Sequence, residues 1–285
     1  MFAALCAKRR ESASGKIDAL AVRVIFRKRR KRLMDSLTSY RLVTRDLTRS
    51  LSTTAKEKIV ANDIKYYLAN IGKVTSIDQF VGNTRLFTFA MNAFGLGDMS
   101  TAKGLIKKVL AEGVGSSTTL ANKLNDSRYV ALAKTFNFAQ NGTATTQSDT
   151  VRQPVVDAYV RQQLETEQGA DHPAVQLALY FQRQAPTVKS PYGLLADASL
   201  WKVVKTAFDF PDAMANAPIA KQAQAITARL KIADLSDPAK VDKLLRTFAI
   251  KYDLAQNAPA APALQLFGAG GTDVSMSILS LKYGG

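Results

Sequence analysis

The chain has 285 residues, of which 47% are hydrophobic, and it carries a formal net charge of +16. Cys6 is its one cysteine and His172 its one histidine, which excludes an intrachain disulfide and any zinc or iron–sulfur site built from several cysteines. The length suffices for a sizeable core, and because Ala and Leu dominate with few β-branched runs, the composition favours helices.

The first 33 residues hold much of the positive charge. Eleven Lys and Arg against two acids give this segment +9, which leaves +7 for the rest of the chain. Its apolar stretch is too short to span a membrane, and because the basic cluster follows that stretch, it is not a secretory signal. We expect either that translation starts at Met34 or that residues 1–33 form a disordered basic arm. The candidate contacts for phosphate or another anion are Arg27, Lys28, Arg29, Arg30, Lys31 and Arg32.

Helical patterning begins after Met34. Apolar residues recur at three- and four-residue spacing over 38–52 and 55–71, which predicts two helices. A third apolar stripe ends at Gly95, where we expect a helix C-cap. The residues expected to cap the starts of helices are Ser76, Asn83, Asp126, Ser190 and Asp197.

The second half of the chain has the same character. Residues 137–148 are small and polar and are the best candidate for a linker. A long helix is predicted over 149–168, and Pro173, Pro191, Pro218 and Pro238 are placed to open later helices. Because no stretch alternates in the manner of a strand, we predict an all-α protein with no significant sheet.

An internal repeat underlies this pattern. A shift of 114 positions pairs residues 66–99 with residues 180–213, and the paired positions are mostly apolar, small or cap-forming. The matches include Tyr66 with Tyr180, Ser76 with Ser190, Leu86 with Leu200, Phe94 with Phe208, and Asp98 with Asp212. We therefore predict two degenerate copies of a multi-helix unit, over 34–140 and 149–256. The pattern leaves open whether the copies are separate lobes or share one core, although the long helices before each block favour an integrated pair.

Residues 257–285 form a tail of different composition. Pro259 and Pro262 break helix, and a glycine-rich stretch follows. The last apolar residues lie at roughly helical spacing, so they either dock onto a partner or fold back on their own domain. The candidate docking residues are Val274, Met276, Ile278, Leu279 and Leu281.

Several long blocks of the sequence resemble a known family. They are YYLANIGKVTSIDQFVGNTRLFTFAMNAFGLGDM, AKGLIKKVLAEG, LANKLNDSRYVALAKTFNF, VRQPVVDAYVRQQLETEQG and LALYFQRQAPTVKSPYGLLAD. Together they cover about residues 36–256, and they are similar to an all-helical family of unknown function that is typical of rhizobia and related alphaproteobacteria. Genes of that family lie in or near flagellar gene clusters. The resemblance therefore implies a role in flagellar assembly or motility, with no catalytic residues to carry over.

The residues themselves give little indication of a reactive site. Asp171 and His172 could form an acid–base pair, but a turn with Asp171 as helix cap and Pro173 at the first helical position explains them better. Glu165 and Glu167 are too few, and too exposed in pattern, for a metal site. We expect no metal, no cofactor and no enzymatic activity. The bulky aromatic residues are expected in the core: Tyr66, Tyr67, Phe87, Phe89 and Trp201.

The expected function follows from the resemblance and from the lack of a reactive group. We expect a non-enzymatic accessory or structural protein that contacts flagellar proteins, in the cytoplasm or at the flagellum. The alternative is a basic nucleic-acid-binding protein that uses the run from Arg27 to Arg32. Nucleic acid is the less favoured partner, because the basic residues are not interleaved with aromatic residues for stacking.

Overall fold

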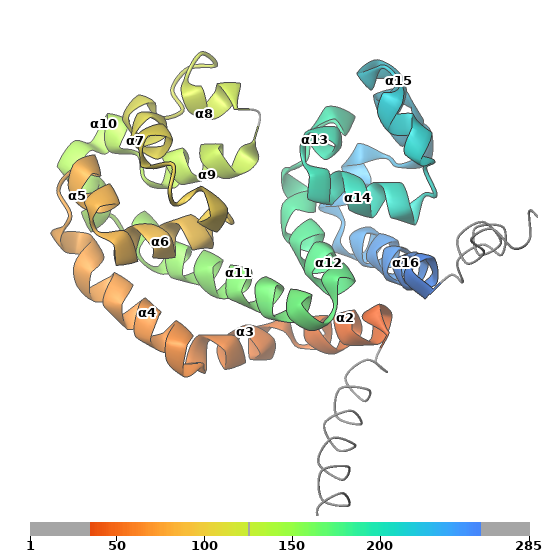
Figure 1. Ribbon diagram of the computed structural model, residues 1–285, viewed down its shortest axis with the longest axis horizontal. Helices are drawn as coiled ribbons and strands as arrows, with labels where there is room; N and C mark the ends of the chain where they lie inside the picture. Colours follow the sequence, from red (N-terminus) through yellow and green to blue (C-terminus); the bar gives the residue numbers. More distant parts are fainter. Residues whose placement is uncertain (1–34, 125, 258–285) are drawn as a thin grey trace, which may run out of the picture.

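The computed structural model describes residues 35–124 and 126–257, which form helices joined by short turns, without a β-strand among them (Figure 1). The predicted all-α fold class is confirmed. The α-helices are α2 (Ser36–Arg45), α3 (Leu47–Lys56), α4 (Lys58–Asn70), α5 (Ile77–Gly82), α6 (Thr84–Ala93), α7 (Lys103–Glu112), α8 (Leu120–Lys123), α9 (Ser127–Thr135), α10 (Phe138–Asn141), α11 (Gln153–Asp171), α12 (Pro173–Gln184), α13 (Pro191–Ala196), α14 (Ala198–Ala207), α15 (Ile219–Arg229) and α16 (Pro238–Asn257). The 3-10 helices are η1 (Ile71–Lys73), η2 (Gly97–Met99), η3 (Gly142–Gln147), η4 (Asp149–Val151), η5 (Ala185–Thr187), η6 (Asp212–Asn216) and η7 (Ile232–Ser236).

Two hydrophobic cores divide these helices into a first and a second lobe, which lie on the left and right of Figure 1. The first core gathers side chains from α4 to α10 and from the start of α11, and Phe80 and Phe136 are fully buried in it. The second core gathers side chains from α2 and from α12 to α16, and Phe181 and Phe248 are fully buried there. Each lobe therefore buries its own apolar surface.

Helix α11 connects the two lobes. Its residues up to Val160 belong to the first core, whereas Leu164, one turn later, belongs to the second. Helix α3 packs beside α11, and α2 lies in the second lobe although it precedes the first lobe in the sequence (Figure 1). The boundary between the two cores thus lies within α11, and α2 belongs to the second lobe. This division differs from the predicted segments 34–140 and 149–256.

The predicted linker over 137–148 is wrong. These residues form α10 and η3, and Phe138, Thr145 and Thr146 are buried against the first lobe. The Thr146 hydroxyl donates a hydrogen bond of 2.5 Å to the carbonyl oxygen of Val74. Small polar side chains suit such a turn because their hydroxyl groups can satisfy buried backbone oxygens.

The single helix predicted over 38–52 is also wrong, because the structure breaks it at Asp46. This residue leaves helical geometry, with φ −140° and ψ 74°, and its carboxylate accepts a hydrogen bond from the backbone N–H of Arg49. Asp46 thereby caps a second helix, α3. The apolar spacing continues across the break, which is why periodicity alone did not reveal it.

Three pairs of elements keep the 114-residue offset. Adding 114 to the bounds of η1, α5 and α6 gives the bounds of η5, α13 and α14. The predicted caps Ser76, Asn83, Ser190 and Asp197 all accept hydrogen bonds from the helices that they precede. The next pair, α7 and α15, differs in length and in offset. The shared arrangement therefore covers a short helix and the core helix that follows it.

The ends of α6 and α14 are also built alike. Gly95 adopts φ 69° and Asp209, its partner at the 114-residue offset, adopts φ 52°, both in the left-handed region. In each case the next backbone N–H reaches back to a carbonyl in the last turn, from Leu96 to Met91 and from Phe210 to Lys205. This is the Schellman arrangement that the glycine at position 95 predicts.

Candidate functional site

The residues that the sequence predicts to contact a partner lie outside the described part of the chain. This applies to the basic run from Arg27 to Arg32 and to the tail residues from Val274 to Leu281. The strongest candidate site within the described residues is a cleft between the two lobes.

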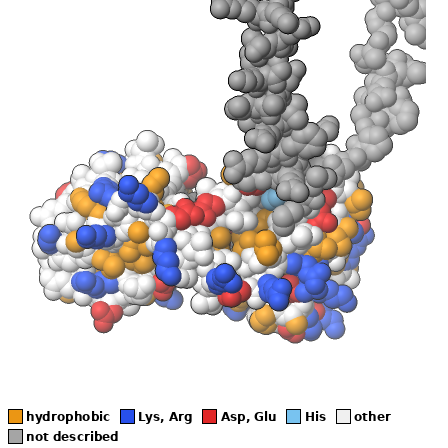
Figure 2. All heavy atoms as spheres, turned by 90° about the horizontal axis from the view of Figure 1, so that it is seen from below, with side chains coloured by type: hydrophobic (Ala, Val, Ile, Leu, Met, Phe, Trp, Pro, Cys, Tyr) orange, Lys and Arg blue, Asp and Glu red, His pale blue; other side chains and the backbone are white. Residues whose placement is uncertain are grey.

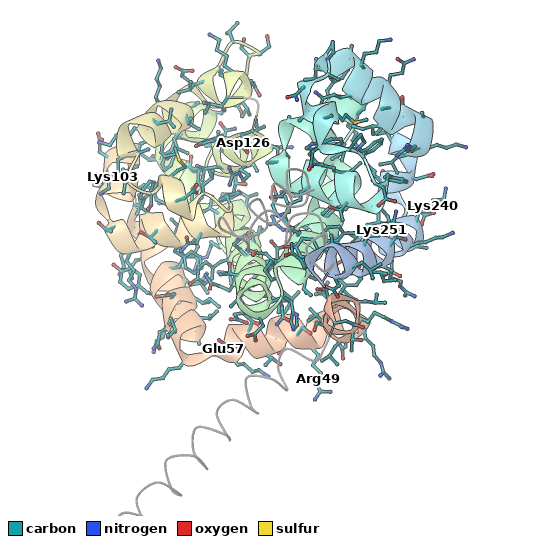
Figure 3. All side chains as sticks on the ribbon, turned by 45° about the vertical axis from the view of Figure 1, so that its right-hand side comes forward. Arg49, Glu57, Lys103, Asp126, Lys240 and Lys251 are labelled. Atoms are coloured by element: carbon teal, nitrogen blue, oxygen red, sulfur yellow. The ribbon has the colours of Figure 1, made fainter. Side chains whose placement is uncertain are left out.

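This inter-lobe cleft has a volume of about 640 Å³. Gly95 at the end of α6 and Asp126 and Arg128 at the start of α9 line it from the first lobe. Helix α12 and the start of α14 line it from the second lobe, and Gln162 and Glu165 of α11 line it between them. Figure 3 shows Asp126 on the edge of the first lobe that faces the second lobe. The cleft therefore exists only because the two cores are separate.

Arg128 is held firmly on the first-lobe wall. Its guanidinium makes three hydrogen bonds to the Asp126 carboxylate, the shortest 2.8 Å, and a further one of 2.6 Å to the carbonyl oxygen of Gly95. The hydrogen bond to Asp126 raises the pKa of Arg128 above its usual value. The side chain thus caps the carbonyl end of α6 and is already paired, so it is not a free contact for an anion.

Tyr180 and Asp197 form the second-lobe wall. The Tyr180 hydroxyl donates a hydrogen bond of 2.6 Å to the Asp197 carboxylate, which also accepts from the backbone N–H groups of Ser199 and Leu200. Burial and the neighbouring Asp197 raise the pKa of the Tyr180 hydroxyl well above its usual 10. The phenol therefore remains neutral at physiological pH and fastens α12 to the start of α14.

Glu165 is a buried carboxylate beneath the cleft, with a side chain only 1% exposed. Arg183 donates to both of its oxygens at 2.9 Å, and Arg161 donates to one of them at 3.2 Å. The two guanidinium groups pair with the carboxylate and so offset the free-energy cost of burying its charge. The network locks α11 against α12 and so sets the base of the second-lobe wall.

Comparison with known proteins places this architecture in a family. Residues 93–241 match the family described as protein of unknown function (DUF1217). The chain belongs to this family. It is also similar to the crystal structure of protein AGR_C_984 from Agrobacterium tumefaciens, with 45% sequence identity and a TM-score of 0.72, over 77% of this chain and 93% of that one. No curated protein matches the sequence.

The prediction of an all-helical family of unknown function is confirmed by these matches. The residues that the structure describes in this DUF1217 protein contain no helix long and apolar enough to cross a membrane. The same residues contain no group of three or more His, Cys, Asp or Glu side chains placed to hold a metal ion.

The inter-lobe cleft also presents amide groups. Gln176 and Gln184 flank Tyr180 at four-residue spacing on α12, so the three side chains share one face of that helix. Both glutamine side chains are half-buried, and neither amide makes a hydrogen bond to another described residue. An amide carries both donors and an acceptor, which is what a peptide backbone or a polar side chain requires.

The structure corrects two expectations about charged residues in this DUF1217 chain. Asp171 does not cap a helix: it is the last residue of α11, and His172 occupies the cap position of α12 without a side-chain cap hydrogen bond. Glu165 is buried rather than exposed, because Arg183 meets it from the next helix. The expected core aromatics Tyr67, Phe87 and Phe89 are buried, whereas Tyr66 and Trp201 are half-buried.

The sequence does not predict the cleft, because the residues of its two walls are far apart in the chain. One signal was present in the repeat, where Tyr66 pairs with Tyr180 and Asn83 pairs with Asp197. The structure places Tyr66 and Asn83 in hydrogen-bond contact, at the same sequence separation of 17 as Tyr180 and Asp197. The separation of 17 residues indicates that Tyr180 and Asp197 form a hydrogen-bonded pair, but it does not predict the cleft beside them.

Proposed function

We propose that this protein is a non-enzymatic accessory or structural protein of the flagellar system that acts through protein–protein contacts. The flagellar part rests on the resemblance to a family whose genes lie in or near flagellar gene clusters. We further propose that the protein acts in the cytoplasm or at the flagellum, with flagellar proteins as its partners.

One observation carries the contact-based function. The ionisable side chains that line the inter-lobe cleft at Arg128, Glu165 and Asp197 are all bonded to other groups of the protein. The cleft also presents the amide groups of Gln176 and Gln184 and the hydroxyl groups of Ser127 and Ser199, beside half-buried apolar surface. Such a surface suits recognition of a polypeptide segment better than chemistry on a substrate.

A deletion strain tests the proposal. Loss of the gene from the organism that encodes it should reduce swimming in soft agar and alter flagella seen by electron microscopy. Affinity capture of the tagged protein from motile cells should recover rod, hook or export-apparatus proteins. Normal motility with normal flagella in the deletion strain would contradict the proposed role.

Complementation localises the contact to the cleft. The double variant Gln176→Ala/Gln184→Ala should restore motility poorly and lose captured partners, because it removes both free amides. Gln224→Ala on α15, which does not line the cleft, is the matched control and should complement fully. Equal complementation by both variants would remove the cleft from the proposal.

A further inference from the structure

A second hollow lies on the second lobe, away from the inter-lobe cleft. This basic groove, of about 530 Å³, runs between the end of α14, the turn from α15 into η7, and α16. Figure 3 shows Lys240, which lines it, on the outer side of that lobe. None of its lining residues also lines the cleft, so the two surfaces are independent.

The floor of the basic groove is apolar. Leu230, Leu235 and Val241 are buried beneath it, while Phe208 and Leu244 are half-buried and still present apolar surface to solvent. An apolar floor of this kind gains free energy when another apolar side chain displaces water from it.

The rim of the basic groove carries four cations against one acid: Arg229, Lys231, Lys240, Lys243 and Asp234. Arg229 donates to the carbonyl oxygen of Phe208 at 2.5 Å, and Lys240 pairs with Asp234 at 2.6 Å. The side chains of Lys231 and Lys243 are exposed and make no ion pair or hydrogen bond with the rest of the described chain. Lys and Arg side chains gather visibly on this lobe in Figure 2.

The spacing of the α16 residues indicates the shape of the occupant. Lys240, Lys243, Leu244 and Thr247 line the groove at positions i, i+3, i+4 and i+7, which form one continuous stripe along a helix. A stripe of this spacing is the surface along which a second helix packs.

We propose that the basic groove docks an acidic amphipathic helix of a partner protein. The apolar face of that helix lies on Phe208 and Leu244, and its flanking carboxylates pair with Lys231 and Lys243. Charge disfavours the chain's own tail as occupant, since residues 258–285 hold one acid, Asp273, and one cation, Lys282. That the partner is a protein rests on the proposed function. The groove itself indicates that the docking segment of this partner is an acidic amphipathic helix.

The test uses the full chain and a synthetic probe. The probe is a fluorescein-labelled helical peptide with leucines along one face and glutamates on both flanks, and its control has lysines in place of the glutamates. We expect fluorescence anisotropy to show saturable binding of the acidic peptide and at least about tenfold weaker binding of the lysine peptide. Binding should weaken as salt is raised, because exposed charge pairs are screened. Equal binding of the two peptides, or binding of neither, would overturn the proposal.

Charge-reversal variants locate the contact. Lys231→Glu/Lys243→Glu should weaken binding of the acidic peptide about tenfold or more, whereas Lys103→Glu/Lys134→Glu should change it less than about twofold. The second pair is exposed on the first lobe and changes the net charge equally. If the two double variants behave alike, the groove is not the docking site.

Competition identifies the occupant. A synthetic peptide of residues 272–285 and a short DNA duplex should each fail to displace the acidic peptide. Displacement by the first would assign the groove to the chain's own tail, and displacement by the second would assign it to phosphate. Either result would overturn the choice of occupant. Because these measurements need no motile cells, they can fail or succeed independently of the deletion phenotype.

Discussion

At the scale of single residues, Glu165 and Gly95 each have a structural role that one substitution can test. Glu165 is buried between two arginines, and Gly95 holds a left-handed backbone at the edge of the inter-lobe cleft. Arg183 of the next helix pairs with Glu165, whereas Gly95 ends its own helix, α6, and each residue has a matched control elsewhere in the chain.

Replacing Glu165 with Gln should destabilise the fold strongly. The change leaves the shape but removes the charge that Arg161 and Arg183 surround, so two guanidinium groups lose their carboxylate. The expected loss is about 3–5 kcal/mol of unfolding free energy, measured by urea denaturation. Asp157→Asn on the same helix, at an exposed position, should cost less than about 0.5 kcal/mol. A similar cost for both would mean that the buried network is not stabilising.

Replacing Gly95 with Ala should cost about 1–2 kcal/mol, because φ 69° is unfavourable for any residue with a Cβ atom. The added Cβ would also lie 3.5 Å from the Oε1 atom of Gln162, which is ordinary contact, so backbone strain is the main cost. Gly104→Ala in α7, where the new Cβ meets nothing within 4 Å, should instead be neutral or stabilising by up to about 1 kcal/mol. Opposite signs in thermal denaturation are the expected result, and a stabilising Gly95→Ala would contradict it.

At the scale of elements, the corner between α3 and α4 lies against α11, where Glu57 of the corner is close to Glu167 of α11. Thr54 at the end of α3 donates to Glu167 of α11 at 3.1 Å. Partial burial, together with the negative charge of Glu57 at the corner, raises the pKa of Glu167 above its usual 4.5. A raised carboxyl pKa means that the folded state holds this proton more tightly than the unfolded chain does.

The pH dependence of stability follows from the raised pKa of Glu167. The contribution of Glu167 to stability is greatest below about pH 4.5, where the carboxyl is protonated in both states, and it is lost as pH rises through the raised pKa of the folded state. Glu167→Gln should therefore raise the urea midpoint more at about pH 8 than at about pH 5. Asp157→Asn on the same helix should leave the difference between the two pH values unchanged. If Glu167→Gln lost stability equally at both pH values, the ionised Glu167 would stabilise the corner and the prediction would be contradicted.

At the scale of the whole molecule, two cores share one connecting helix. Leu110 is fully buried in the first core and Leu179 in the second, so Leu→Ala at either position should cost about 2–5 kcal/mol. Hydrogen exchange should then rise mainly in the lobe that carries the substitution, because among the described residues Leu51 of α3 is the one side chain that packs against both cores. If both variants accelerated exchange of the same amides throughout the chain, the lobes would unfold as one unit.

The sequence alone determined what depends on neighbours along the chain. The all-α class follows from apolar spacing, and the caps at Ser76, Asn83 and Asp197 follow from short polar side chains that reach the next two or three backbone N–H groups. The repeat was visible for the same reason, since it preserves local capping and packing positions.

Only the tertiary structure decided where distant segments meet. Thr146 donates a hydrogen bond to Val74 across 72 positions, and Arg183 of α12 pairs with Glu165 of α11 across 18 positions. Arg128 lines the cleft from one lobe, and Tyr180 and Asp197 line it from the other. An exposed and a buried glutamate look alike in a sequence, because burial depends on what packs against the residue rather than on its chain neighbours. The apolar faces of the helices pack into two separate cores. The inter-lobe cleft lies between the two lobes, and the basic groove lies on the second lobe.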